Sequence, residues 1–232
     1  MKTIVCEKKE FADKAADRIC GILEQKPDAV LALACGETMT PVWEKLCERC
    51  RHGDISFRGV RIFCVSEYCD VPEEKSCRYE LQKGLLDGLD AESANCFFPD
   101  PSAPEETEAK LEALGGIDLA VLGIGEDAHI GYNEPGTLFE SKTHVQKLTD
   151  RTKRQLLKRG FSETDMPNYA VTMGIHTLTS ARDILVLASG SDKAAPVFEM
   201  LYAKTMPYIP AAYLQIPLDV TVLLDSEAAS RL

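Results

Sequence analysis

Four short runs of almost entirely apolar residues constrain the fold of this chain more than any other feature. They occupy residues 29–34, 117–122, 184–188 and 220–224. Each run has the length of a buried strand, and stretches with the apolar spacing of a helix lie between them. Strands that are apolar on both faces are typical of parallel sheets covered by helices on both sides. We therefore expect a doubly wound, Rossmann-like α/β fold with a mostly parallel sheet.

The same alternation of strand and helix continues along the chain. Further strands are expected at 60–65 and 169–173, with a short extended segment at 4–5. A chain of 232 residues with no internal repeat and no low-complexity segment is expected to form a single domain over residues 1–232. The helices predicted from apolar spacing are 11–23, 41–50, 76–86, 105–114 and 193–202.

Composition and charge narrow the classes of function. The net charge of −11 disfavours nucleic-acid binding, because contact with a phosphate backbone needs clustered lysine and arginine. The densest basic run, 153–159, is either a local exception or the solvated face of a helix. No apolar run reaches the length of a membrane-spanning helix, and the first residues lack the apolar core of a secretory signal. We therefore expect a cytoplasmic protein with no membrane partner.

The nine cysteines are interpreted as reduced thiols, as expected of a cytoplasmic chain. Cys47 and Cys50 have the spacing of half a zinc site, but the second half of such a pattern is missing. The sequence therefore predicts no metal site.

Three polar loops follow predicted strands, at residues 35–38, 66–70 and 125–137. Ligands of doubly wound sheets bind outside the carboxyl ends of the strands. We expect the three loops to form one site there.

The segment 123–136 is the richest in reactive groups, with Asp127, His129 and Glu134 close together after a predicted strand. A histidine can exchange protons near neutral pH, while one carboxylate fixes its tautomer and another supports its basicity. The alternative is a polar loop held together by its own side chains. The segment begins with Gly123 and Gly125, but the third glycine of a dinucleotide-binding fingerprint is missing.

This segment, Gly-Ile-Gly-Glu-Asp-Ala-His-Ile-Gly-Tyr-Asn-Glu-Pro-Gly, closely resembles a loop of the glucosamine-6-phosphate and galactosamine-6-phosphate deaminase/isomerase family. The sequences of residues 26–34 and 209–214 look most similar to the galactosamine-6-phosphate branch of this family. The resemblance extends over nearly the whole chain, with further landmarks at 26–38, 66–72, 115–119 and 190–194.

The resemblance implies an enzyme that converts an amino-sugar phosphate to a ketose phosphate with loss of ammonia, without a metal or organic cofactor. It implies that His129 assists opening of the sugar ring, with Asp127 and Glu134 as its carboxylate partners. The substrate would be galactosamine 6-phosphate or glucosamine 6-phosphate, and the sequence leaves the epimer open.

The resemblance also implies a phosphate site. Arg159, or its neighbour Lys158, lies near the family's phosphate-binding arginine. Backbone N–H groups at the start of a helix suit an anion. The other positions that match the family's phosphate site are Cys35, Gly36, Thr38 and Lys193.

Two positions depart from the family pattern. The family's Asp-Glu-Tyr reads Ser66-Glu67-Tyr68 here, and a serine hydroxyl is too weak a base to replace the aspartate that moves a proton between C2 and C1. Unless Glu67 or Asp70 substitutes, we expect isomerisation to be slow or absent. Glu37 lies inside the phosphate cradle, where a carboxylate about 4 Å from a phosphate would repel it by roughly 4 kcal/mol. Glu37 should therefore point outward, or the ligand differs.

Two alternative functions stay open. A 6-phosphogluconolactonase-like hydrolase shares the fold and the cradle, but residues 130–135 favour the deaminase. A catalytically impaired sugar-phosphate-binding protein is suggested by Ser66. His144 and His176 are interpreted as a surface residue and a candidate for the pocket wall. The short segment after the last predicted strand suggests a monomer or a small homo-oligomer.

Overall fold

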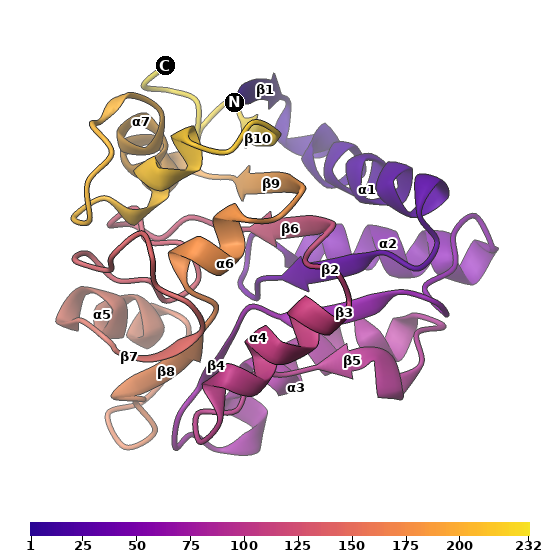
Figure 1. Cartoon of the computed structure of the whole chain (residues 1–232). Helices are drawn as coiled ribbons and strands as arrows, with labels where there is room; N and C mark the ends of the chain where they lie inside the picture. The colour runs from indigo at the N-terminus through magenta and orange to yellow at the C-terminus, as the bar shows by residue number, and fades with distance from the viewer.

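The computed structural model describes residues 1–232 and contains a seven-stranded sheet with helices on both faces (Figure 1). All pairs of neighbouring strands in this sheet are parallel. The strands lie in the order β1-β10-β9-β6-β2-β3-β5. Their bounds are β1 Lys2–Cys6, β2 Val30–Leu33, β3 Arg61–Cys64, β5 Cys96–Phe97, β6 Leu119–Leu122, β9 Asp183–Ala188 and β10 Val220–Asp225. The prediction of a doubly wound α/β fold is confirmed.

The central strands are buried on both faces because helices cover the sheet from two sides. In Figure 1, α4 and α6 lie in front of the sheet, and α2 and α3 lie behind it. Every residue of β2 and β6 is buried, as their continuous apolar sequences predict. None of the helices is both long and apolar enough to cross a membrane. The helices are α1 Lys8–Gln25, α2 Thr40–His52, α3 Cys77–Gly84, α4 Pro104–Ala113, α5 Asp150–Lys158, α6 Ile175–Thr179 and α7 Ala194–Tyr202.

A second, smaller sheet corrects the sequence analysis. It consists of β4 Ser66–Tyr68, β8 Tyr169–Thr172 and β7 His144–Lys147, paired antiparallel in the order β4-β8-β7. The strand predicted at 169–173 therefore exists, but it is not part of the main sheet. Residues 66–68, expected as a loop, form a strand because the chain continues from β3 and pairs with β8.

The order of strands places a switch point between β2 and β6. After β2 the next strand of this sheet is β3, on one side, whereas after β6 the next strand of this sheet is β9, on the other side. The loops that leave the carboxyl ends of β2 and β6 therefore diverge and leave a crevice. The turn that follows β9 lies at the same edge of the sheet, since all three strands are parallel.

Candidate active site

A cavity of about 670 Å³ opens at this switch point, at the carboxyl ends of the central strands. Its walls come mainly from the segments that follow β2, β6 and β9, from Ser66 of β4, from α5 and from the start of α1. Three predicted residues, Asp127, Glu134 and Glu67, are not part of its lining. The predicted residues that line it are Cys35, Gly36, Thr38, Ser66, His129, Arg159 and Lys193.

A tight turn after β6 fixes the position of His129. The Gly125 N–H donates to the His129 carbonyl at 2.9 Å, and the Ala128 N–H donates to the Gly125 carbonyl at 3.0 Å. Ala128 has a φ of 59°, so the turn includes a left-handed residue that is not glycine. A Cβ atom at position 125 would overlap the imidazole ring of His129. Gly125 is therefore required for the ring to lie against the backbone.

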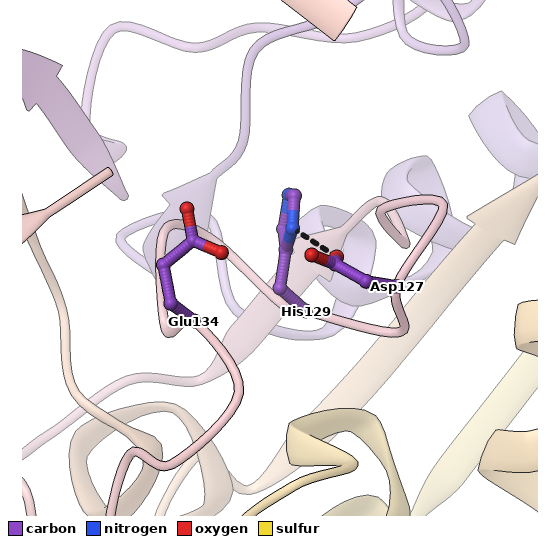
Figure 2. A group of neighbouring side chains, drawn as sticks. All are labelled: Asp127, His129 and Glu134. Carbon is purple, nitrogen blue, oxygen red and sulfur yellow. Dashed lines mark hydrogen bonds and ion pairs between the residues drawn. The ribbon is translucent and has the colours of Figure 1, made fainter. Parts of the chain in front are cut away.

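Asp127 orients the His129 ring from the side away from the cavity. Its Oδ1 lies 2.6 Å from Nδ1 of His129, and the two side chains are only 7% and 9% exposed (Figure 2). Burial opposes ionisation of Asp127, but the hydrogen bond and charge of His129 outweigh burial and lower the pKa of this carboxyl. The pair can therefore present a histidine backed by a charged carboxylate.

Glu134 lies on the opposite side of the His129 ring from Asp127 (Figure 2). Its two carboxylate oxygens accept from the backbone N–H and the hydroxyl of Thr149, each at 3.1 Å, and none of its hydrogen bonds is to His129. Each of Asp127, His129 and Glu134 offers one atom that could ligate a metal ion, and these three atoms all lie within 4.8 Å of one another. The three side chains could therefore hold a cation. Glu134 contacts the start of α5, and it is a neighbour of the histidine rather than its hydrogen-bond partner.

The loop after β2 forms a small anion cradle. Gly36 lies before the start of α2 and has a φ of 135°, a backbone conformation that favours glycine. This N–H donates to Oε1 of Glu80, on α3, at 2.7 Å. Arg159, directly after α5, places Nη2 2.9 Å from Oε2 of the same carboxylate. A backbone N–H and a guanidinium therefore converge on one carboxylate.

Arg159 remains charged in this half-buried position. Burial opposes its charge, but the neighbouring Tyr68, Tyr132 and Glu80 outweigh burial and raise the pKa of the guanidinium. The hydroxyls of Tyr68 and Tyr132 are hydrogen-bonded to each other, and Nη1 of Arg159 lies 3.4 Å from the Tyr68 hydroxyl.

Lys193 reaches the cavity from the turn after β9. The buried Asp225 holds this turn, because it accepts from the Ser189 hydroxyl at 2.7 Å and from the Gly190 N–H at 3.0 Å. Nζ of Lys193 lies 3.3 Å from the carboxylate of Asp192, next to it in sequence. Lys158, the alternative to Arg159, also lines the cavity and pairs with Glu126 at 3.0 Å.

Ser66 is buried in the cavity wall, opposite Thr172 of β8. Their hydroxyl oxygens are 2.8 Å apart, and the Thr172 oxygen also accepts from the backbone N–H of Tyr132 at 3.0 Å. At this place the structure presents a hydroxyl pair and no carboxylate.

Glu67, left open as a substitute for the missing aspartate, does not line the cavity in this structure. Its carboxylate accepts from the backbone N–H groups of Tyr68, Cys77 and Arg78, each at 2.8 Å. These contacts hold the first turn of α3, where a carboxylate is favourable. Asp70 does not line the cavity either.

The remaining predicted positions have distinct surroundings. Glu37 lies at the cavity edge and is exposed. The pKa of the Cys35 thiol is raised well above its usual value, chiefly by its hydrogen bond with the Cys64 thiol, so Cys35 lines the cavity as a neutral group. His144 lies on β7 and His176 on α6, and neither lines the cavity.

Sequence reasoning missed Glu80 and Tyr132. Tyr132 belongs to the segment 123–136 and follows the histidine closely, so its place beside the cavity could have been inferred. Glu80 gives no signal in the sequence, because a glutamate on a short polar helix is most often a surface residue.

Comparison with known proteins identifies the family. Residues 7–222 match the family described as glucosamine-6-phosphate isomerases/6-phosphogluconolactonase. A glucosamine-6-phosphate deaminase of Bacillus velezensis is 40% identical over 239 residues, covering 99% of each chain. A glucosamine-6-phosphate deaminase of a Geobacillus strain is 40% identical, covering 95% of this chain and 91% of its own.

Solved structures agree with this match. The structure of a monomeric glucosamine-6-phosphate deaminase superposes with a TM-score of 0.95 at 34% identity and covers all of both chains. A 6-phosphogluconolactonase of Trypanosoma cruzi has a TM-score of 0.79 at 20% identity, covers 100% of this chain and 96% of its own, and shows a shared fold alone. The predicted resemblance to a family of enzymes that act on amino-sugar phosphates is confirmed, while assignment to the galactosamine branch stays a prediction. The chain belongs to the glucosamine-6-phosphate isomerase/6-phosphogluconolactonase family.

Proposed function

We propose that this chain binds an amino-sugar 6-phosphate in the cavity at the switch point and converts it to a ketose 6-phosphate and ammonia. The observation that carries the proposal is His129, which is held by Asp127 and lines the same cavity as Gly36 and Arg159 of the anion cradle. The relatives at 40% identity, named glucosamine-6-phosphate deaminases, support the same substrate class. The single domain is proposed to comprise residues 1–232.

In the proposed complex the phosphate binds to the Gly36 N–H, Arg159 and Lys193. All three line the cavity, and a dianion suits a backbone N–H together with two cationic side chains. His129 then lies beside the sugar. Its Nδ1 is engaged by Asp127, so Nε2 exchanges protons with the ring oxygen and the anomeric hydroxyl as the ring opens.

The next step is where this chain differs from its family pattern. Conversion of a 2-amino aldose to a ketose moves a proton from C2 to C1 and leaves an imine at C2, which water hydrolyses to the ketone with release of ammonia. Ser66 stands where the resemblance implies a carboxylate base, and its hydroxyl is paired with Thr172. We propose that turnover is limited by this proton transfer.

The same observation favours a second candidate, a sugar-phosphate-binding protein with little or no turnover. Such a protein would keep the anion cradle and the cavity and would lack only the carboxylate base at position 66. A 6-phosphogluconolactonase activity has no comparable support, because structures under 25% identity show only the fold.

The decisive experiment measures ammonia release from glucosamine 6-phosphate and galactosamine 6-phosphate in parallel, with His129→Ala as the control. Release that is lost in His129→Ala would establish the deaminase, and the faster sugar would fix the epimer. No release at high enzyme concentration, with either sugar still raising the melting temperature, would instead establish the binding protein. Hydrolysis of 6-phosphogluconolactone in the same preparation would contradict both.

A further inference from the structure

The anion cradle already contains a carboxylate of the protein itself. Glu80 accepts from the Gly36 N–H at 2.7 Å through one oxygen and from Nη2 of Arg159 at 2.9 Å through the other. Gly36 lies 44 residues before Glu80 and Arg159 lies 79 residues after it, so two distant loops converge on one side chain. A carboxylate that joins a backbone N–H to a guanidinium is bonded as a bound anion would be.

We propose that Glu80 is an intramolecular competitor of the substrate phosphate and sets the affinity of the cavity for phosphorylated ligands. This inference rests on the proposed phosphate position of the preceding section. A phosphate that binds to Gly36 and Arg159 must displace the Glu80 carboxylate from both donors. The energy of those two charge-assisted hydrogen bonds is then lost before the phosphate gains its own.

The surroundings of Glu80 allow this exchange. Its side chain is 35% exposed and extends from the surface of α3, so the carboxylate can turn into water without disturbing the core. Gly36 has a φ of 135°, and nothing lies within 4 Å of the place that a Cβ atom would take, so the space beside this residue is open to either anion.

The other cations of the cavity do not offer the same switch. Lys158 pairs with Glu126 at 3.0 Å, Lys193 with Asp192 at 3.3 Å and Lys8 with Glu227 at 3.6 Å. None of these carboxylates is bonded to the cradle N–H of Gly36. Only Glu80 therefore occupies the place of the ligand, and the other acids merely offset a neighbouring charge.

The test is calorimetric titration of inorganic phosphate, glucosamine 6-phosphate and unphosphorylated glucosamine into the wild type, Glu80→Ala and Glu80→Gln. If Glu80 fills the cradle in about nine of ten molecules, its removal tightens apparent binding about tenfold. We expect this gain for the two phosphorylated ligands with Glu80→Ala, a smaller gain with Glu80→Gln, and no gain for glucosamine. The matched control is Glu126→Ala, which removes the same charge from the cavity wall and leaves the cradle closed.

Equal or weaker phosphate binding by a folded Glu80→Ala protein would overturn the inference, because Glu80 would then hold Arg159 in place for the ligand. A gain of the same size in Glu126→Ala would also overturn it and assign the effect to overall charge. Tighter phosphate binding without ammonia release would support the inference and contradict the deaminase. Ammonia release by the wild type, with unchanged phosphate binding in Glu80→Ala, would support the deaminase and overturn the inference about Glu80.

Discussion

Oδ1 of Asp127 lies 2.6 Å from Nδ1 of His129, and this contact decides which ring nitrogen meets a ligand. An ionised carboxylate at Nδ1 keeps the proton there, so the neutral ring has its lone pair on Nε2. The pKa of Asp127 is lowered despite its burial, so this carboxylate stays ionised throughout the neutral range.

The first prediction concerns this pair. In Asp127→Asn, the amide can donate to Nδ1 and favour the wrong tautomer, so we expect kcat for ammonia release to fall about 100-fold with KM little changed. Steady-state kinetics with both sugars checks this. Asp70→Asn, which alters an acid outside the cavity, serves as the control. A large rise in KM instead would mean that Asp127 holds the substrate.

Gly125 offers a test that leaves every polar group in place. A methyl group at this position would overlap the His129 ring, so Gly125→Ala should displace the imidazole and reduce activity about 100-fold, as expected for loss of a general acid or base. Gly123→Ala is the matched control, since its Cβ would meet only the Met39 Cε at 3.4 Å. Circular dichroism establishes that both variants fold. Full activity in Gly125→Ala would contradict the assigned position of His129.

Ser66→Asp tests whether a missing base limits turnover. A carboxylate beside Thr172 and the cavity should raise the rate of ammonia release at least about tenfold. This is a minimum, because a well-placed general base contributes about 100-fold or more. Ser66→Ala removes the hydroxyl without adding a base and should leave the rate unchanged. If Ser66→Asp binds the sugar phosphate and gains nothing, another step limits the reaction.

Asp118 provides a prediction about pH and stability. Burial opposes its ionisation, but Lys26, the Val30 N–H and Arg182 outweigh burial and lower the pKa of its carboxyl. A lowered pKa in the folded state gives stability that is fully present above the unfolded pKa of about 3.9 and is lost as pH falls through the folded pKa. We expect Asp118→Asn to lower the free energy of unfolding by about 2 kcal/mol at pH 7, and the difference from wild type to shrink below about pH 4.

Urea denaturation at pH 7, 5 and 3 measures this difference. The exposed Asp28, 3.6 Å from Arg61, gives the control Asp28→Asn, for which no measurable change is expected. A difference that stays constant from pH 7 to pH 3 would show that Asp118 contributes through packing and not through its charge.

The parts of the fold that could be predicted are those whose sequence alone fixes their surroundings. The mostly apolar run at 117–122 is typical of a buried strand, and β6, Leu119–Leu122, lies within it. Residues 66–68 are polar and form a strand only because Val171 and its neighbours on β8, about 100 residues away, pair with them. Glu80 could not be predicted for the same reason, because its contacts are with Gly36 and Arg159, which are distant in sequence, and not with its own helix. His129 could be found because its turn and its carboxylate are local in sequence.

The pairing of β1 has a consequence for how the chain is assembled during synthesis. β1 is bonded only to β10, the last of the strands along the chain, and Asp225 at the end of β10 also holds the turn that precedes Lys193. Until β10 has been translated, β1 has no strand partner and the turn that precedes Lys193 lacks its contact with Asp225. The cavity is therefore completed only when β10 joins β1 to β9, so its walls come together as one of the final events of folding.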